Sequence, residues 1–380
     1  MEKNKKICFV TINSPPDFLG GYVLYHKNLI EYLKKRYKHL EINWVYFGKE
    51  NKSYKKDGIN YFELDGEGAI SSFTFGRSFK LYRFFTKNYF DIINSIGGLW
   101  TYLYKKKEGQ KIIQTSHGAI YYFNRNHLRR FSFFKKILFF PLLPLSWILE
   151  RPHKETDKII CVSDKVKLQV EKLYGRRKNI YVVRTGVDLK VFKPGNKSEN
   201  RKKLKLEDKK LYGLYVGGGG YWTKGLDRAV SLGREIYNLN KNFRLLLIGP
   251  NYKKVKHLIN EPFIKFLKDV EREKMPLYYS ASDMFFNMSR YEGGAPTLVT
   301  SEAMASGCLI VCSKDSEQEI VKDNENSLII SEFGKKDAKR ILETFNDKKL
   351  REKIIKRSME TIKEFSLEKW GKRTSEVLLK

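Results

Sequence analysis

The sequence of 380 residues has few cysteines and no recognisable metal-binding motif. Its four cysteines, Cys8, Cys161, Cys308 and Cys312, lie in apolar, strand-like runs, with neither metal-ligand spacing nor a compact disulfide framework. We therefore expect reduced core thiols in a cytoplasmic protein. The Asp-x-Asp pattern is also absent, and the sequence predicts no metal site.

Long hydrophobic runs are absent as well. The longest apolar stretch, 137–149, is shorter than the roughly 20 residues that cross a bilayer, and it contains Pro141 and Pro144. The apolar run 7–12 is too short for a secretory signal. We expect no segment of the sequence to cross a membrane.

Acidic residues are scarce relative to basic ones. The chain has 43 Asp and Glu against 74 Lys and Arg, a formal net charge of +31, and residues 1–193 alone carry 37 basic and 17 acidic side chains. Such an excess attracts anions without distinguishing phosphates, lipid headgroups and nucleic acid. Because the basic residues are scattered and no nucleic-acid-binding motif occurs, no nucleic acid partner is expected.

Short apolar runs alternate with longer amphipathic stretches along the whole chain. The predicted strands are 7–12, 42–47, 59–64, 91–95, 112–115, 159–162, 211–216, 243–248, 284–288, 309–312 and 328–330. This alternation predicts parallel βα units, and hence an α/β fold with two Rossmann-like, doubly wound domains. We place the domains at 1–190 and 191–360, followed by a closing helix at 361–380.

Two glycine-rich turns follow predicted strands. Gly20 and Gly21 open a helix, where bare backbone N–H groups can face a phosphate or a sugar; an ordinary βα turn is an equally good interpretation. The second run, 216–225, contains Gly217, Gly218 and Gly219 and reaches Lys224 just before a helical pattern. A flexible loop is one interpretation, but a lysine in this place favours phosphate binding.

The stretch 289–307 lies between two predicted strands and contains two acids. Small residues from Gly293 to Thr297 open a short helix whose positive end can face an anion. Glu302 lies inside that helix, where a carboxylate can accept two hydrogen bonds from a ribose diol. Taken singly, each of Glu292 and Glu302 is by default interpreted as a solvated helix-end charge.

The run from Glu292 to Gly307, EGGAPTLVTSEAMASG, resembles the donor signature of glycosyltransferase family 4 enzymes, which have the GT-B fold. Further matching segments are Gly20-Gly21, 115–118, 157–163, 185–194, Lys224-Gly225, 281–289, 308–313 and 365–370. The resemblance implies an amino-terminal acceptor-binding domain and a carboxyl-terminal donor-binding domain facing across a cleft, with the closing helix crossing back to the first domain.

The resemblance also implies roles. Lys224 would bind the donor diphosphate, Glu302 the ribose, and Glu292 the transferred sugar, with His117 near that sugar as a second catalytic candidate. Without the resemblance, His117 is interpreted as a strand-end histidine satisfied by backbone. The expected donor-binding residues are Gly20, Gly21, Arg184, Gly217, Gly218, Gly219, Lys224, Gly293, Gly294, Ala295, Pro296, Thr297, Leu298 and Glu302.

The activity so implied is retaining and needs neither metal nor cofactor. A UDP- or GDP-sugar would be the donor, and a glycan or lipid-linked molecule the acceptor. Helix amino termini and Lys224 can stabilise the departing diphosphate without a metal.

Two features depart from the family pattern. Nine residues separate Glu292 from Glu302, whereas the family has seven. Either a bulge keeps Glu292 on the sugar, or the backbone takes over its role. The family's arginine ahead of the lysine is also missing, and Arg184, Arg228 or glycine N–H groups are the candidates to replace it.

Residues 125–154 contain seven basic side chains and one acid around a Phe-, Leu- and Trp-rich centre. Such a segment can lie in the headgroup region of an anionic membrane, or it can be a core helix of the first domain; both interpretations stay open. The first places the protein peripherally on the inner face of the membrane, within reach of a lipid-linked acceptor. A sugar phosphorylase on the same fold and a non-catalytic protein that binds membrane or nucleic acid are the alternative functions.

Overall fold

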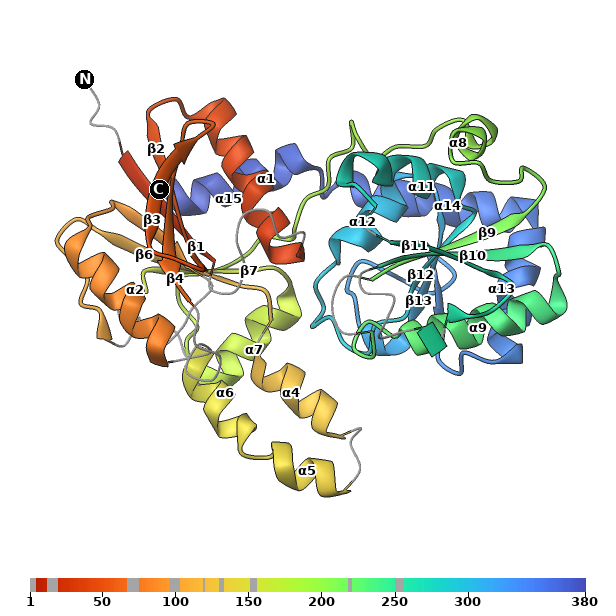
Figure 1. Cartoon of the computed structure of the whole chain (residues 1–380), viewed down its shortest axis with the longest axis horizontal. Helices are drawn as coiled ribbons and strands as arrows, with labels where there is room; N and C mark the ends of the chain where they lie inside the picture. Colours follow the sequence, from red (N-terminus) through yellow and green to blue (C-terminus); the bar gives the residue numbers. More distant parts are fainter. Residues whose placement is uncertain are drawn as a thin grey trace. The chain divides into compact units, whose positions relative to one another are not determined.

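The computed structural model describes residues 5–11, 20–66, 75–95, 103–118, 120–129, 133–150, 156–217, 221–249, 256–257, 259–268 and 270–380. The chain forms two compact α/β units, each built on its own sheet (Figure 1). The first unit is Met1–Arg184 together with Trp370–Lys380, and the second is Thr185–Lys369. No helix among the described residues is long and apolar enough to span a bilayer.

The first unit has an eight-stranded sheet in the order β3-β4-β2-β1-β5-β6-β7-β8. Its strands are β1 (Lys5–Thr11), β2 (Leu40–Gly48), β3 (Lys52–Lys56), β4 (Ile59–Asp65), β5 (Ile92–Ser95), β6 (Lys111–Ser116), β7 (Lys158–Cys161) and β8 (Ile180–Val182). Its helices are α1 (Gly21–Arg36), α2 (Phe75–Lys87), α4 (Ile120–Arg129), α5 (Phe133–Phe139), α6 (Leu142–Glu150), α7 (Asp164–Tyr174) and, from Trp370 on, α15 (Leu367–Leu379). All neighbouring strands are parallel except β3 and β4.

The second unit has a six-stranded, fully parallel sheet in the order β11-β10-β9-β12-β13-β14. Its strands are β9 (Leu211–Val216), β10 (Phe243–Gly249), β11 (Ile264–Lys268), β12 (Met284–Asn287), β13 (Leu309–Ser313) and β14 (Leu328–Ile330). Its helices are α8 (Lys197–Lys203), α9 (Leu226–Leu239), η2 (Arg272–Lys274), α11 (Met275–Ala281), α12 (Leu298–Ala305), η3 (Lys314–Ser316), α13 (Lys335–Asn346) and α14 (Lys348–Lys363). The prediction of two Rossmann-like parallel sheets is confirmed.

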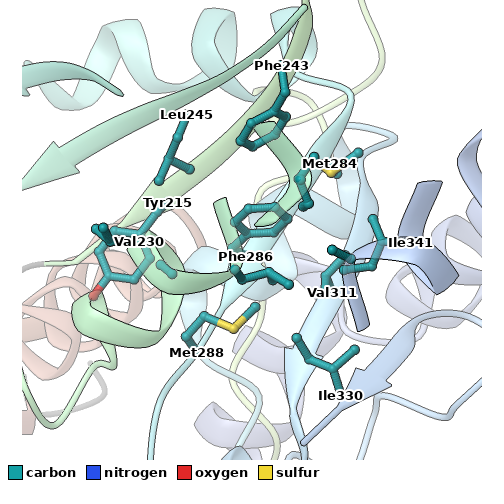
Figure 2. Packing of buried hydrophobic residues seen from close by; sticks show 14 of the residues in the cluster. Tyr215, Val230, Phe243, Leu245, Met284, Phe286, Met288, Val311, Ile330 and Ile341 are labelled. Atoms are coloured by element: carbon teal, nitrogen blue, oxygen red, sulfur yellow. The ribbon is translucent and has the colours of Figure 1, made fainter. Parts of the chain in front are cut away.

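Alternate residues of each strand in the second sheet face two separate hydrophobic clusters. Phe243, Leu245 and Leu247 of β10 join the cluster that contains α9 and α13, whereas Leu246 and Ile248 join the cluster that contains α11 and α12. Figure 2 shows the first cluster, including Tyr215, Val230, Met284, Phe286, Met288, Val311, Ile330 and Ile341. Helices α9 and α12 therefore cover opposite faces of this sheet.

That arrangement produces a topological switch point in each sheet. In the second unit β9 lies between β10 and β12, so the helix after β9 and the helix after β12 depart to opposite faces. In the first unit β1 lies between β2 and β5. Ligands of doubly wound sheets bind at the carboxyl ends of the strands at such points. The loops after β9 and β12 are thus the first place to look for a site.

Three strands were not predicted from the sequence. β3 has the sequence KSYKK and is exposed along its whole length, and β8 is a short strand of three residues whose central Tyr181 is exposed. β11 resembles β3 in that lysines interrupt it, at two of its five residues. Lysine on an edge strand prevents further pairing with another chain, which accounts for the composition of β3.

A buried histidine in α1 predicts how stability depends on pH. His26 is fully buried, its Nδ1 bonds the Tyr22 carbonyl at 2.8 Å, and burial lowers its pKa to about 4. Its unfolded pKa is about 6.5, so the unfolded state binds more protons between these values and stability falls as the pH drops below about 6.5. We expect His26 to cost about 2 kcal/mol of unfolding free energy between pH 7 and pH 5. Denaturant unfolding of His26→Phe should show a smaller loss, while the exposed-site variant His39→Gln should match the wild type; an unchanged loss in His26→Phe would contradict the assignment.

Candidate functional site

The loops after β9 and β12 bring a lysine and a glutamate together. The Lys224 ammonium lies 2.8 and 3.1 Å from the two carboxylate oxygens of Glu292. The Glu292 side chain is largely buried, and the Lys224 side chain keeps 39% of its surface exposed. A half-exposed ammonium at the carboxyl ends of two switch-point strands can exchange its carboxylate partner for an incoming anion.

Gly225 fixes Lys224 in this place. The residue has a φ of 71°, and a Cβ added to it would lie 1.9 Å from the Met288 carbonyl oxygen. Only glycine therefore lets the start of α9 approach the end of β12 so closely. The backbone bond from Arg290 N to Thr223 O, at 3.0 Å, closes the same contact.

A glycine turn follows Glu292 and leads into α12. Gly293 and Gly294 have φ values of 65° and 83°, in the left-handed region. This turn accommodates the additional residues between the two acids while Glu292 still reaches Lys224. Ala295 is partly exposed and Pro296 is buried. The turn thus leads the chain to the amino end of α12 while Glu292 keeps its contact with Lys224.

Helix α12 begins with a side-chain cap. Thr297 accepts a hydrogen bond from Thr300 N, and its own N–H donates to Gln318 at 3.0 Å. Thr297 and Leu298 at the start of the helix are partly exposed. The amino end of α12 is thus partly exposed, and such a helix end favours an anion.

Glu302 is in the body of α12 and is engaged on both oxygens. One oxygen accepts from the Arg272 guanidinium and the other from the Tyr279 hydroxyl at 2.9 Å. The residue is only 1% exposed, while the Arg272 side chain is partly exposed. The interpretation of Glu292 and Glu302 as solvated helix-end charges is wrong, because both are held by cations in a buried or nearly buried place.

The predicted residues of the first unit lie at the carboxyl ends of its strands. Gly20 caps α1 with an extended backbone, and a Cβ added to Gly21 would meet nothing within 4 Å. The fold therefore does not require glycine at position 21. His117 follows β6 directly, and its ring packs edge-on against Tyr25 with centroids 4.8 Å apart.

His117 is neutral near pH 7. Burial, together with the charge of His26, lowers its pKa to about 3. Its buried Nε2 has no hydrogen-bond partner among the described residues, so the interpretation of a histidine fully satisfied by backbone is not supported. A neutral imidazole can exchange hydrogen bonds with a hydroxyl group but does not supply a positive charge.

The candidates for the missing arginine have partners elsewhere. Arg184 pairs with Asp164 in the first unit, and Arg228 pairs with Asp315 at 2.6 Å in the second. Of the three predicted glycines after β9, Gly217 lies against the Tyr215 ring, since a Cβ added to it would be 2.7 Å from a ring atom. Gly218 and Gly219 lie outside the described residues.

Two arginines that support the site were missed from the sequence. Arg290 stacks over the Trp222 ring at 4.4 Å and forms a forked pair with Asp227, which fixes the loop ahead of Lys224. Arg272 holds Glu302 from 30 residues away in the sequence. Arg290 lies close to Glu292 in the sequence, which could have marked it as a site residue, whereas no local pattern points to Arg272.

The described residues of 125–154 lie in or between α4, α5 and α6 of the first unit (Figure 1). On and next to α5, Phe133, Phe134, Ile137 and Phe140 are exposed, with Phe134 83% exposed. The interpretation of a core helix is therefore wrong for α5. Its apolar side chains form an exposed patch, together with the exposed Lys136.

The chain is similar to known glycosyltransferases. The model of Glycosyltransferase Family 4 matches residues 19–191, and that of Glycosyl transferases group 1 matches residues 196–361. An uncharacterized glycosyltransferase of Methanocaldococcus jannaschii is 25% identical over 386 residues, covering 96% of this chain and 95% of that protein.

Solved structures share the fold at low identity. Sucrose-phosphate synthase of Thermosynechococcus elongatus has a TM-score of 0.79 at 16% identity, with 98% of both chains covered. The Anabaena protein HepE, solved with UDP and glucose, has a TM-score of 0.69 at 16% identity over 98% of this chain and 99% of that one. This chain belongs to the family 4-like glycosyltransferases: it has the GT-B fold and is an enzyme.

Proposed function

We propose that this glycosyltransferase moves a sugar from a UDP- or GDP-sugar to a glycan or lipid-linked acceptor, with retention of configuration and without a metal. The observation that carries the proposal is the Lys224–Glu292 pair, 2.8 Å long, at the carboxyl ends of β9 and β12. Glu302 would bind the ribose and Lys224 the diphosphate, so both contacts come from the second unit. The HepE structures with UDP and with UDP-glucose support a nucleotide-sugar donor.

The proposed reaction needs a stabilised leaving group. The bond between the anomeric carbon and the diphosphate oxygen breaks, the acceptor oxygen bonds the same face of that carbon, and the acceptor proton passes to the departing phosphate. Lys224 and the amino end of α12 stabilise the charge that develops on this phosphate. Retention and metal independence rest on the family resemblance.

A nucleotide panel tests the proposal. UDP, GDP and ADP and their glucose conjugates are added without metal, and unfolding is followed thermally. A bound nucleotide at 100 times its Kd should stabilise the protein by about 2.7 kcal/mol. Stabilisation by UDP or GDP, followed by transfer from the matching sugar, supports the proposal. Release of a sugar phosphate from a glycan with inorganic phosphate alone would instead identify a phosphorylase.

Gly21 allows a test in the first unit, since we propose that it contacts the substrate through its bare backbone. A Cβ at position 21 meets no atom within 4 Å, so Gly21→Ala should leave the unfolding free energy within about 0.5 kcal/mol of wild type. The same change should lower kcat/KM by roughly tenfold or more, because the methyl group occupies the place of the ligand. Steady-state kinetics and urea unfolding on one preparation separate the two effects; full activity in Gly21→Ala would remove Gly21 from the site.

We further propose that the protein binds anionic membranes peripherally through α5. The exposed Phe133, Phe134 and Ile137 offer the apolar surface, and Lys136 the charge for anionic headgroups. Sedimentation with phosphatidylglycerol vesicles should recover the wild type at low salt and much less of Phe133→Ser/Phe134→Ser. Equal recovery of both proteins would contradict a role for α5.

A further inference from the structure

The first unit contains a second basic feature, far from the predicted substrate residues. A pocket of about 730 Å³ lies where β6 and β7 begin and where the loop from α7 enters β8. His117 follows the opposite end of β6. At about 3.3 Å per residue, Lys111 at the start of that strand is about 20 Å from His117. The pocket is therefore separate from the carboxyl ends of the strands.

The lining of this pocket is strongly cationic. Its charged residues are the bases Lys106, Lys111, Lys158, Arg176, Arg177 and Lys178 and a single acid, Asp157. That acid is already engaged, since Lys106 lies 2.7 Å from one oxygen and Ile112 N donates to the other at 2.8 Å. Six cations and one carboxylate leave a net formal charge of five positive units in one cavity.

Three of the other cations bond to backbone oxygens. Lys111 donates to Lys380 O and Lys158 to Val377 O, each at 2.9 Å, and Arg176 donates to Thr156 O. The bonds of Lys111 and Lys158 orient these two side chains toward the end of α15. The carbonyls that accept from Lys158 and Arg176 are neutral, so these two positive charges are not compensated by their acceptors. Burial and the charge of Lys111 both lower the pKa of Lys158, as expected for a cation among cations.

Arg177 and Lys178 complete the pocket from the loop after α7. Gly175 ends that helix with a φ of 67°, which turns the chain so that residues 175–179 line the cavity. Both side chains are exposed. Among the described residues, neither side chain makes a hydrogen bond to a backbone oxygen like those of Lys111 and Lys158.

We propose that this pocket is a second anion site, which binds a ligand carrying two or more phosphates. Several converging cations suit a polyanion better than a single phosphate, and the volume is in the range of small-molecule sites and exceeds that of one phosphate. A soluble polyphosphate compound and a phosphorylated lipid headgroup share this chemistry. The site would hold the ligand away from the transfer reaction.

The test compares two double variants with the wild type. Arg177→Ala/Lys178→Ala removes two exposed cations of the pocket, and Lys55→Ala/Lys56→Ala removes two exposed cations from β3 at the other edge of the same sheet. Lys224 is intact in all three proteins, so any binding to the second unit is common to them. Inorganic tripolyphosphate is titrated calorimetrically at fixed ionic strength, and vesicles that contain phosphatidylinositol 4,5-bisphosphate are used in a parallel sedimentation.

The pocket variant should bind tripolyphosphate roughly tenfold more weakly than wild type, and the β3 variant should match the wild type. A loss confined to the vesicle experiment would identify the ligand as a lipid headgroup. Equal binding by the two double variants in both experiments, or no binding by the wild type in either, would overturn the proposal.

Discussion

Replacing Lys224 with alanine is expected to lower kcat for sugar transfer by about 10² to 10³-fold. Its ammonium is the half-exposed cation at the switch point of the second sheet, and it is held there by Glu292 at 2.8 Å. A donor group aimed at developing negative charge contributes this much in other enzymes. Steady-state transfer kinetics with saturating donor give the value directly.

Two matched variants support the interpretation of this result. Lys349→Ala removes an exposed lysine of α14 in the same unit and should retain full activity. Glu292→Gln keeps the size of the side chain but removes the charge that holds Lys224, and should show an intermediate loss. A Lys224→Ala enzyme within twofold of the wild type would exclude Lys224 from the donor site.

The second large effect concerns Glu302 and combines a structural and a ligand-binding role. Glu302→Gln should lower the unfolding free energy by about 2 kcal/mol, because Arg272 is then left partly buried without its charged partner. We also expect this variant to lose the stabilisation by nucleotide. The measurements are urea unfolding with and without UDP.

A double variant separates the two roles. Arg272→Met/Glu302→Gln removes both charges and should recover much of the stability, since no unpaired cation remains. Nucleotide stabilisation should stay absent if the carboxylate binds the ribose. If the double variant regains the full nucleotide effect, Glu302 serves only to hold Arg272 and Tyr279.

Much of the fold could be predicted from local pattern. Strand β9 was predicted with its observed bounds, because an apolar run followed by glycine marks a buried strand and its turn. The strand β3, with three lysines in five residues, was not, since an exposed edge has no core face to reveal. The four cysteines are buried and free, as expected.

Individual site residues could be predicted from the sequence, but the contacts between them could not. Lys224 and Glu302 were identified by their places in a family-like pattern, whereas the contact of Lys224 with Glu292 depends on how Gly225 packs against Met288. The partner of Glu302 comes from η2, which follows a different strand. Such contacts arise from the sheet order, which a single sequence does not specify.

A structure with bound UDP or GDP tests the central claim most directly. The account predicts that the Lys224 ammonium leaves Glu292 for a diphosphate oxygen and that Glu302 accepts hydrogen bonds from the ribose hydroxyls. Nucleotide bound away from the ends of β9 and β12, with the Lys224–Glu292 and Arg272–Glu302 pairs unchanged, would contradict it.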